Sequence, residues 1–311
     1  MLGLAKIRIG VMPGPWPEGP DAGDLFWRLV DLCERTAVDS LWLSDRLLAP
    51  TLEPLTALAA AAARTRRLKF GTAVLVLPVR SPLLAAKALA TLDVLSGGRV
   101  FPAVGVGLDQ RREWEAAGVP PGMRGRRTDE AIEVIRRLWA EDEVSHRGSY
   151  FTLDRVRLWP RPVQTPPPLW VGGSSEAALR RAGRLGDGWL ASLVTPEAFG
   201  RGVERIQAHA RAAGRTVPAD HFGPIIPFAL AASPAEAWRA AEPYLPRDRA
   251  DEATLRAATA LGPPEAIAAV IERYVARGAS KFVLRPAGPP AAMLDQLAWL
   301  AEAVIPPFHA R

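Results

Sequence analysis

Cysteine is almost absent from this chain of 311 residues. The single Cys33 excludes a disulfide within the chain, and its place on the apolar side of a predicted helix indicates a buried thiol. Zinc sites built from several cysteines are excluded for the same reason. No apolar run approaches the ~20 residues that cross a membrane, and Met1–Lys6 shows no signal-peptide pattern. We therefore expect a cytoplasmic protein with no membrane partner.

Histidine is also scarce, and none of the four histidines follows a predicted strand. The sequence has no paired histidine and carboxylate spacing for a metal, no Ser-His-Asp candidate and no P-loop. We therefore predict no metal site, and a metal-dependent hydrolase is disfavoured because its clustered ligands are missing.

Lysine is rare and arginine is common, and the formal net charge is +6. Such a charge suggests nucleic-acid binding. The arginines are spread over predicted helices, however, and no basic stripe is interleaved with aromatic residues. We therefore expect no nucleic-acid partner and prefer a basic site that attracts an anionic small molecule.

Apolar segments and helical patterns alternate along the chain, which is typical of a parallel α/β protein. Helix start signals such as Ser81-Pro82 and stop signals such as Gly214 mark the boundaries. Eight strands with helical crossovers predict a (β/α)8 TIM barrel, and the alternative is an open doubly wound sheet. We expect the strands over Lys6–Met12, Ser40–Ser44, Leu68–Leu75, Arg99–Gly105, Leu169–Gly172, Gly188–Ala191, Phe222–Leu230 and Lys281–Leu284.

One section, from Asp142 to Pro168, breaks the alternation. Its short extended pieces around a turn and its prolines predict a hairpin and a stiffened linker between strands four and five. No internal repeat or second domain can be separated. We expect residues 1–311 to form a single barrel domain with an excursion at about 142–168.

Ligands of a parallel barrel lie where the strands end, at the C-terminal face. A site poor in acid–base groups is typical of an enzyme whose cofactor carries the chemistry. Few titratable side chains follow the predicted strands, namely Asp45, Arg46, Arg80, Asp109 and Arg285.

Two strand ends contain glycines that let a ligand approach the backbone. In Val171–Glu176 a helix starts directly after the glycines, and its free N–H groups favour a phosphate. A glycine turn with a serine cap is the alternative. Gly105-Val106-Gly107 lacks the third glycine of a dinucleotide fingerprint and ends the fourth strand, so we reject that motif.

Two charged groups of residues have both a structural and a functional interpretation. Asp45 and Arg46 follow the second strand, either as a surface ion pair or as groups on the barrel rim that face a bound ring. Arg124, Arg126 and Arg127 precede a predicted helix, either as a solvated helix start or as a clamp for an anionic cofactor tail.

With these residues assembled, the chain resembles the bacterial luciferase-like flavin family, and within it the branch that uses the deazaflavin coenzyme F420. The matching motifs occur in the family's order and cover most of residues 5–290. They are Asp39–Asp45, Ala90–Arg99, Arg124–Glu130, Leu138–Phe151, Pro160–Gln164, Trp170–Ser175 and Gly183–Trp189.

The resemblance implies a barrel that holds a flavin-type cofactor at its C-terminal mouth. Family members transfer hydride between the cofactor's central ring and a substrate, or activate oxygen on reduced flavin mononucleotide (FMN). We expect an oxidoreductase that transfers hydride between F420 and a small organic substrate. An FMN-dependent monooxygenase that uses oxygen is the alternative, and a non-catalytic flavin-binding barrel stays open. Family members are often dimers, so a homodimer is expected.

The resemblance also implies the site residues. A non-proline cis peptide in the third strand, in a bulge that supports the ring, would fall at Ala73–Val74. The catalytic assignments are Asp45 and Arg46. The phosphate is expected on the last three of the residues assigned to cofactor binding: Ala73, Val74, Gly105, Val106, Gly107, Gly173, Ser174 and Ser175.

Three positions depart from the family's pattern. Deazaflavin members commonly carry Asp-His after the second strand, where this chain has Asp45-Arg46. A histidine after the third-strand arginine is Ser81 here, and a glutamate after the Gly-x-Gly of strand four is Leu108. Because arginine stays protonated, either substrate and solvent supply the proton or Arg46 only stabilises charge.

Overall fold

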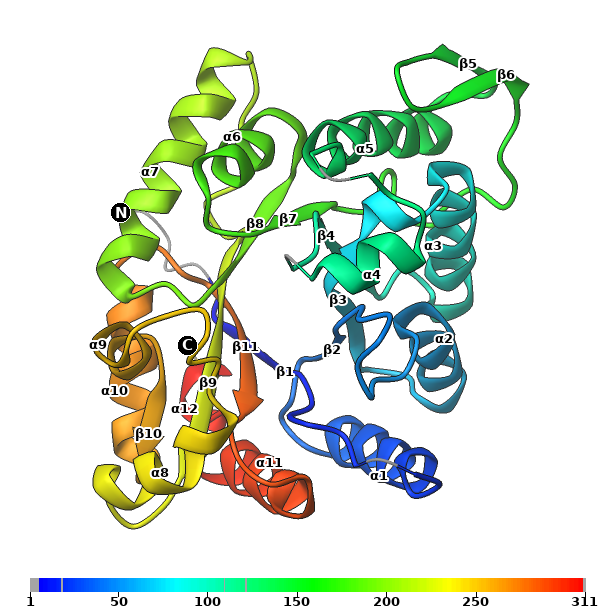
Figure 1. Ribbon diagram of the computed structural model, residues 1–311. Helices are drawn as coiled ribbons and strands as arrows, with labels where there is room; N and C mark the ends of the chain where they lie inside the picture. Colours follow the sequence, from blue (N-terminus) through cyan, green and yellow to red (C-terminus); the bar gives the residue numbers. More distant parts are fainter. Residues whose placement is uncertain (1–5, 18, 109, 121, 310–311) are drawn as a thin grey trace.

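A computed structural model describes residues 6–17, 19–108, 110–120 and 122–309. Its parallel strands close into a barrel, because β8 pairs with β9 and joins the two arms of the sheet (Figure 1). The predicted (β/α)8 fold is confirmed, and the open sheet is wrong. The barrel strands are β1 (Arg8–Val11), β2 (Ser40–Leu43), β3 (Lys69–Val76), β4 (Val100–Gly105), β7 (Trp170–Gly172), β8 (Gly188–Ser192), β9 (Phe222–Leu230) and β11 (Lys281–Pro286).

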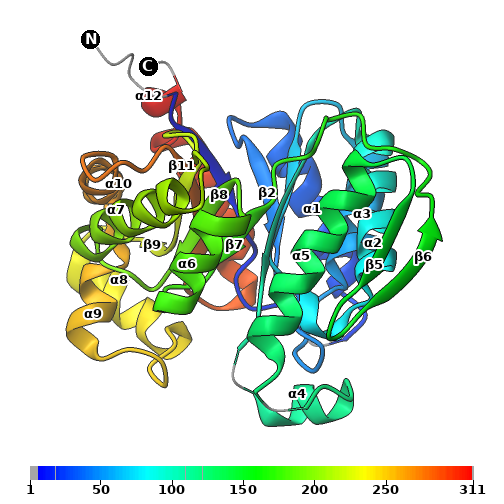
Figure 2. The same cartoon turned by 90° about the horizontal axis from the view of Figure 1, so that it is seen from above.

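Helices connect the strands and surround the barrel. Figure 2 shows α4 and α9 at one end of the barrel and α12 at the other. No helix in the described part of the chain is long and apolar enough to cross a membrane. The α-helices are α1 (Ala22–Arg35), α2 (Pro54–Arg64), α3 (Pro82–Ser96), α4 (Arg111–Ala116), α5 (Arg124–Ala140), α6 (Glu176–Leu185), α7 (Pro196–Ala212), α8 (Pro234–Ala241), α9 (Glu252–Ala257), α10 (Pro264–Val275), α11 (Met293–Ala303) and α12 (Pro306–His309). The 3-10 turns are η1 (Leu77–Val79), η2 (Glu242–Tyr244) and η3 (Pro290–Ala292).

Side-chain caps explain where several of these helices begin. The hydroxyl groups of Ser175, Thr195 and Ser233 accept from the backbone N–H three residues further on, at 3.3, 3.3 and 3.2 Å. Each cap satisfies one of the first-turn donors that lack an intrahelical acceptor.

Some elements differ from the prediction. Helix α5 begins at Arg124, so the arginines expected before the helix lie in its first turn. The short α4 was not predicted. Neither was β10 (Ala260–Gly262), which pairs in parallel with Phe228–Leu230 of β9. With six residues in α4 and three in β10, both elements are too short to show a hydrophobic period of their own.

The excursion between β4 and β7 forms the predicted antiparallel hairpin. Its strands are β5 (Val144–Arg147) and β6 (Thr152–Val156). The linker that follows lies along α3, because the buried Asp93 carboxylate accepts from the backbone N–H of Gln164 at 2.9 Å and from its amide at 2.7 Å. The hairpin therefore lies outside the barrel, while its linker is fixed to the barrel's outer layer.

Two indole rings fill the middle of the barrel. Trp42 of β2 and Trp170 of β7 lie with their ring centroids 6.3 Å apart, in one cluster with Ala103 and Val283. Gly71 of β3 leaves room for the first ring, since a Cβ there would lie 2.1 Å from Cε3 of Trp42. The barrel is thus a packed core rather than a channel, and a ligand is confined to its mouth.

Cys33 lies fully buried on the inner side of α1. Burial raises the pKa of its thiol to about 12. The prediction of a buried thiol is confirmed.

Replacing Gly71 with alanine should destabilise the protein, because the added methyl group would overlap the ring of Trp42. We expect a loss of about 1–3 kcal/mol in unfolding free energy, measured by urea denaturation. Gly23→Ala in α1 is the matched control, because a Cβ there meets nothing within 4 Å. Equal stability of the Gly71→Ala variant and the wild type would contradict this packing.

Candidate functional site

The mouth lies at the C-terminal ends of the strands, where alternate side chains point inward. Along β11, Val283 belongs to the interior cluster, whereas Phe282 and Leu284 pack in the outer core. Lys281 and Arg285 share the inward face with Val283. Arg285, at the C-terminal end of β11, therefore projects into the mouth, and Lys281 lies at the opposite end of the barrel.

The third strand carries a bulge at the mouth. The Ala73–Val74 peptide is cis, as expected, and the pairing of β3 with β4 shifts between Ala73 and Leu75. The Val74 side chain then points at two glycines of neighbouring strands. A Cβ on Gly172 would lie 2.3 Å from Cγ1 of Val74, and one on Gly105 would lie 2.9 Å from Cγ2. The Val74 side chain therefore occupies the space that these two glycines leave.

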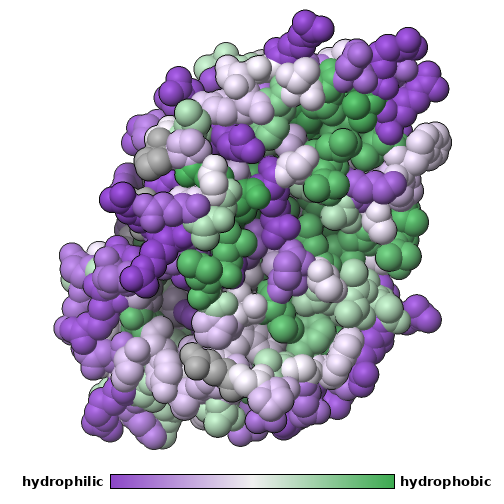
Figure 3. Space-filling model, turned by 45° about the vertical axis from the view of Figure 1, so that its right-hand side comes forward, coloured by the Kyte–Doolittle hydropathy of each residue, from purple (hydrophilic) through white to green (hydrophobic). Residues whose placement is uncertain are grey.

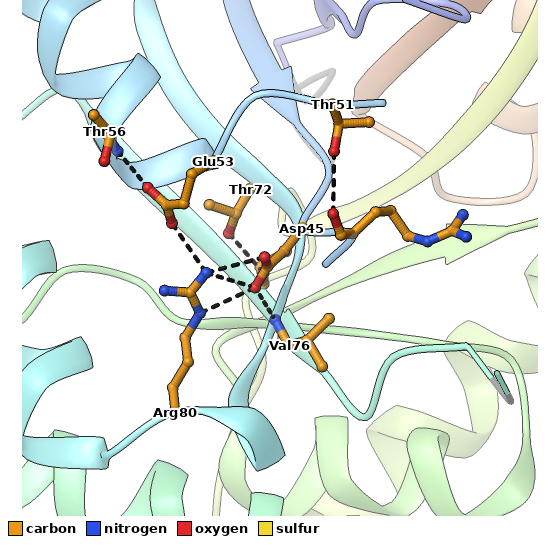
Figure 4. Close-up of polar contacts among 9 residues, drawn as sticks. Asp45, Thr51, Glu53, Thr56, Thr72, Val76 and Arg80 are labelled. Atoms are coloured by element: carbon orange, nitrogen blue, oxygen red, sulfur yellow. Dashed lines mark hydrogen bonds and ion pairs between the residues drawn. The ribbon is translucent and has the colours of Figure 1, made fainter. Parts of the chain in front are cut away.

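Asp45, which follows β2, has a carboxylate occupied by hydrogen bonds (Figure 4). It accepts from Nε and Nη2 of Arg80 and from the backbone N–H of Val76, each at 3.0 Å. Arg80 also donates to Glu53, the N-cap residue of α2, at 2.9 Å. Burial opposes the charge of Arg80, but the hydrogen bonds and charges of Asp45 and Glu53 raise its pKa. The interpretation of Asp45 and Arg46 as a surface ion pair is wrong, because Asp45 is 5% exposed and its partner is Arg80.

Arg46 turns to the loop after β4. Its Nη2 donates to Oε1 of Gln110 at 2.8 Å, and its Nε lies 3.4 Å from Oε1 of Glu113. Gly107 in this loop has a φ of 74°, and a Cβ there would lie 2.9 Å from the Trp114 ring. Gly107 therefore serves the packing of α4 onto the mouth, and Asp109 lies outside the described residues.

The turn after β7 combines a glycine with a helix start. Gly173 has a φ of 110°, which favours glycine, and its carbonyl accepts from the indole N–H of Trp189 at 2.7 Å. Ser174 and Ser175 are exposed, and the Ser175 hydroxyl caps α6. The serine cap that sequence reasoning gave as the alternative is thus present. It uses the N–H of Ala178, and the N–H groups of Glu176 and Ala177 remain available to an anion.

The arginines of α5 are largely engaged by their own chain. Arg124 donates to the carbonyl of Leu108 at 3.1 Å. Arg127 donates to the carbonyl of Pro78 at 2.9 Å. Arg126 is exposed. These contacts tie α5 to the loops after β3 and β4.

The structure thus brings Val74, Gly105 and the turn at Gly173 to neighbouring strand ends, with half-buried Val106 beyond Gly105. Sequence reasoning missed the roles of Arg80 and Glu113, because neither neighbours its partner in the chain. Both could have been found only by pairing each strand-end charge with every opposite charge at the same face.

Comparisons with known proteins include a family match over nearly the whole chain and curated relatives over about half of it. The family model described as luciferase-like monooxygenase matches residues 7–305. An F420-dependent glucose-6-phosphate dehydrogenase from Amycolatopsis mediterranei is 34% identical over 186 residues, which cover 55% of this chain and 52% of that protein. The first curated relatives are matched over 50% to 58% of their length.

Two solved structures share the fold over nearly the whole chain. A monooxygenase from Streptomyces bottropensis has a TM-score of 0.84 at 23% identity, with 97% of this chain and 100% of that one covered. A coenzyme F420 dependent tetrahydromethanopterin reductase from Methanopyrus kandleri has a TM-score of 0.81 at 21% identity, with 98% and 100% covered.

Asp45→Ala should destabilise the mouth, because it removes the acceptor of the Val76 N–H and leaves the Arg80 guanidinium with Glu53 as its remaining carboxylate. Breaking a buried pair in this way costs about 3 kcal/mol. The double variant Asp45→Ala/Arg80→Gln should cost less than the sum of the single changes, as measured by denaturation. Arg247→Gln is the control, since its pair with Glu242 is 61% exposed on the arginine side. Additive losses would contradict the coupling.

Proposed function

Because its family model matches residues 7–305, the chain belongs to the luciferase-like monooxygenase family, and we propose that it is an F420-dependent oxidoreductase. The proposed reaction is hydride transfer between F420 and a small organic substrate. The F420-dependent relatives support this cofactor.

One observation carries the proposal. The Asp45 carboxylate at the mouth is occupied by Arg80, and the other described strand-end charges are the arginines Arg46, Arg80 and Arg285. Arginine stays protonated, so these side chains orient ligands and stabilise charge but are poor acids and bases. A bound deazaflavin or flavin supplies the centre that accepts or donates hydride.

The turn at Gly173 fits the phosphate that F420 and FMN share. A Cβ on Gly173 would come within 3.0 Å of Ala178, so the position needs its glycine. The N–H groups of Glu176 and Ala177 open α6 and have no intrahelical acceptor. The Glu176 carboxylate is drawn toward α7 by Arg205, at 2.6 Å. Backbone N–H groups and the Ser174 hydroxyl would hold the phosphate here.

The other residues of the mouth have distinct proposed roles. Val74 would support one face of the ring, with Gly105 beneath it. The Asp45 and Arg80 pair positions this bulge through the Val76 N–H. Arg46 would stabilise negative charge, while the substrate or solvent supplies the proton.

An FMN-dependent monooxygenase is the second candidate, because the structural neighbour from Streptomyces bottropensis is a monooxygenase. The phosphate turn suits either cofactor. Fluorescence titration of the purified protein with F420 and with FMN distinguishes the two. A protein that binds neither F420 nor FMN would refute an oxidoreductase of either kind. Binding of a cofactor without hydride exchange would favour a non-catalytic barrel.

Ser175→Asp should weaken F420 binding by at least about tenfold, because a carboxylate beside the phosphate repels it. Aspartate remains a good N-cap, so α6 should keep its stability. Ser233→Asp at the start of α8 is the matched control, since Ser233 makes the same cap at 3.2 Å. Unchanged affinity in Ser175→Asp would show that the phosphate lies elsewhere.

We also propose that the protein forms a homodimer through an apolar surface on α3. Leu84 and Leu95 of α3 are 69% and 65% exposed, and Trp159 and Val163 of the adjoining linker are 68% and 57% exposed. The linker is held there by Lys87, which donates to the Trp159 carbonyl. Figure 3 brings this side forward and shows hydrophobic side chains gathered on it. Such a surface favours association, and a two-fold dimer covers it on both copies.

Leu84→Glu should convert the dimer to a monomer, because it would bury a charge in the apolar contact. Sedimentation at micromolar concentration measures the mass, and circular dichroism checks the fold. Leu48→Glu is the control, because Leu48 is 60% exposed but lies in the loop after β2. A monomeric wild type would refute the dimer.

A further inference from the structure

Arg285 is the charged residue that β11 directs into the mouth. It is half-buried, two residues beyond Val283 of the interior cluster. Within the described part of the chain, its guanidinium has no hydrogen-bond or ion-pair partner. Moving an unpaired cation out of water is unfavourable, and arginine cannot relieve this cost by losing its proton.

Two further arginines lie close enough to act on the charge of Arg285. Burial lowers the pKa of Arg285 first, and the positive charges of Arg249 and Arg46 lower it further. Arg249 lies in the loop before α9. Figure 2 shows α9 at the same end of the barrel as α4. Arg249 is exposed, yet surrounding atoms shield it from water enough to lower its pKa. The charge of Arg46 lowers this pKa further, and the charge of Asp248 opposes the shift.

The protein's own carboxylates neutralise this charge incompletely. Glu113 lies 3.4 Å from Arg46, and Asp248 acts on Arg249. Among the described residues, no carboxylate acts on the charge of Arg285. Within this part of the chain, the positive charge of the mouth is therefore balanced at the rim and not at Arg285.

This charge is separate from the turn that we assign to the cofactor phosphate. Strands β8 and β9 lie between β7, which precedes Gly173, and β11, which carries Arg285. On the other side, β1 alone separates β11 from β2, which precedes Arg46. The arginines thus occupy one sector of the mouth, and the phosphate turn occupies another.

We propose that Arg285 and Arg249 bind an oxyanion group of the substrate, a carboxylate or a phosphate, and that Arg46 adds to the attraction. The planar guanidinium donates two parallel hydrogen bonds to either group, which fixes orientation as well as position. The proposal rests on the proposed function, because it places an anionic substrate beside the cofactor. It restricts the substrate to small organic acids or phosphate esters.

The test compares binding of two anions with binding of F420. Inorganic phosphate and benzoate are titrated by calorimetry into the wild type, with and without F420, and benzamide serves as the uncharged analogue of benzoate. We expect at least one anion to bind in both states, while benzamide does not. Tighter phosphate binding indicates a phosphate ester, and tighter benzoate binding indicates a carboxylic acid.

Variants then locate the anion. Arg285→Gln should weaken anion binding at least about tenfold, as expected for the loss of charge-assisted hydrogen bonds, and leave F420 affinity unchanged. Ser175→Asp should do the reverse. Arg211→Gln, an exposed arginine in the last turn of α7, removes the same charge far from the mouth and should change neither.

Three results would overturn the inference. These are a wild type that binds neither anion, equal losses in Arg285→Gln and Arg211→Gln, and an Arg285→Gln variant that loses F420 instead. In the last case the proposed function stands and the arginines serve the cofactor. If Arg285→Gln does not fold, two other variants serve the same comparison. We expect Arg249→Gln to weaken anion binding and the charge-preserving Arg285→Lys to retain it.

Discussion

The contact between Val74 and the two glycines that face it determines the shape of the mouth. Gly105 and Gly172 belong to adjacent strands, and side chains at either position would collide with Val74. The shift in pairing between Ala73 and Leu75 turns the valine toward them. Trp42 and Trp170 fill the barrel below. The mouth therefore has an apolar floor and cannot extend further into the core.

Around this floor, hydrogen bonds rather than solvent exposure determine where the charged side chains lie. The Asp45 carboxylate uses its acceptors on Arg80 and on the backbone, which joins the ends of β2 and β3. Glu53 extends the same network to the start of α2. Among the described residues, the acidic groups near the mouth are therefore engaged in support, and the chemistry of the mouth is left to its cations and to a bound ligand.

Much of the fold was predictable because it depends on local patterns. The strand around Trp42 and the cap at Ser175 are visible within a few residues, and alternation along the chain then selects the barrel. The pairing of Asp45 with Arg80 joins residues 35 positions apart, and no local pattern announces it. The sequence also suggested that Gly105 makes room for a ligand, whereas its nearest neighbour is Val74, brought there by a change in register. Arg285 was recognisable as a strand-end charge, but its lack of a partner among the described residues depends on the whole mouth.

The burial of Cys33 has a practical consequence for study of the mouth. A thiol with a pKa raised to about 12 inside α1 is a poor nucleophile at neutral pH. A cysteine introduced at an exposed position such as Leu48 would then be the reactive thiol of the chain, with no native cysteine to remove first. Spectroscopic labels can thus be attached one at a time around the barrel opening, and its movements followed in solution.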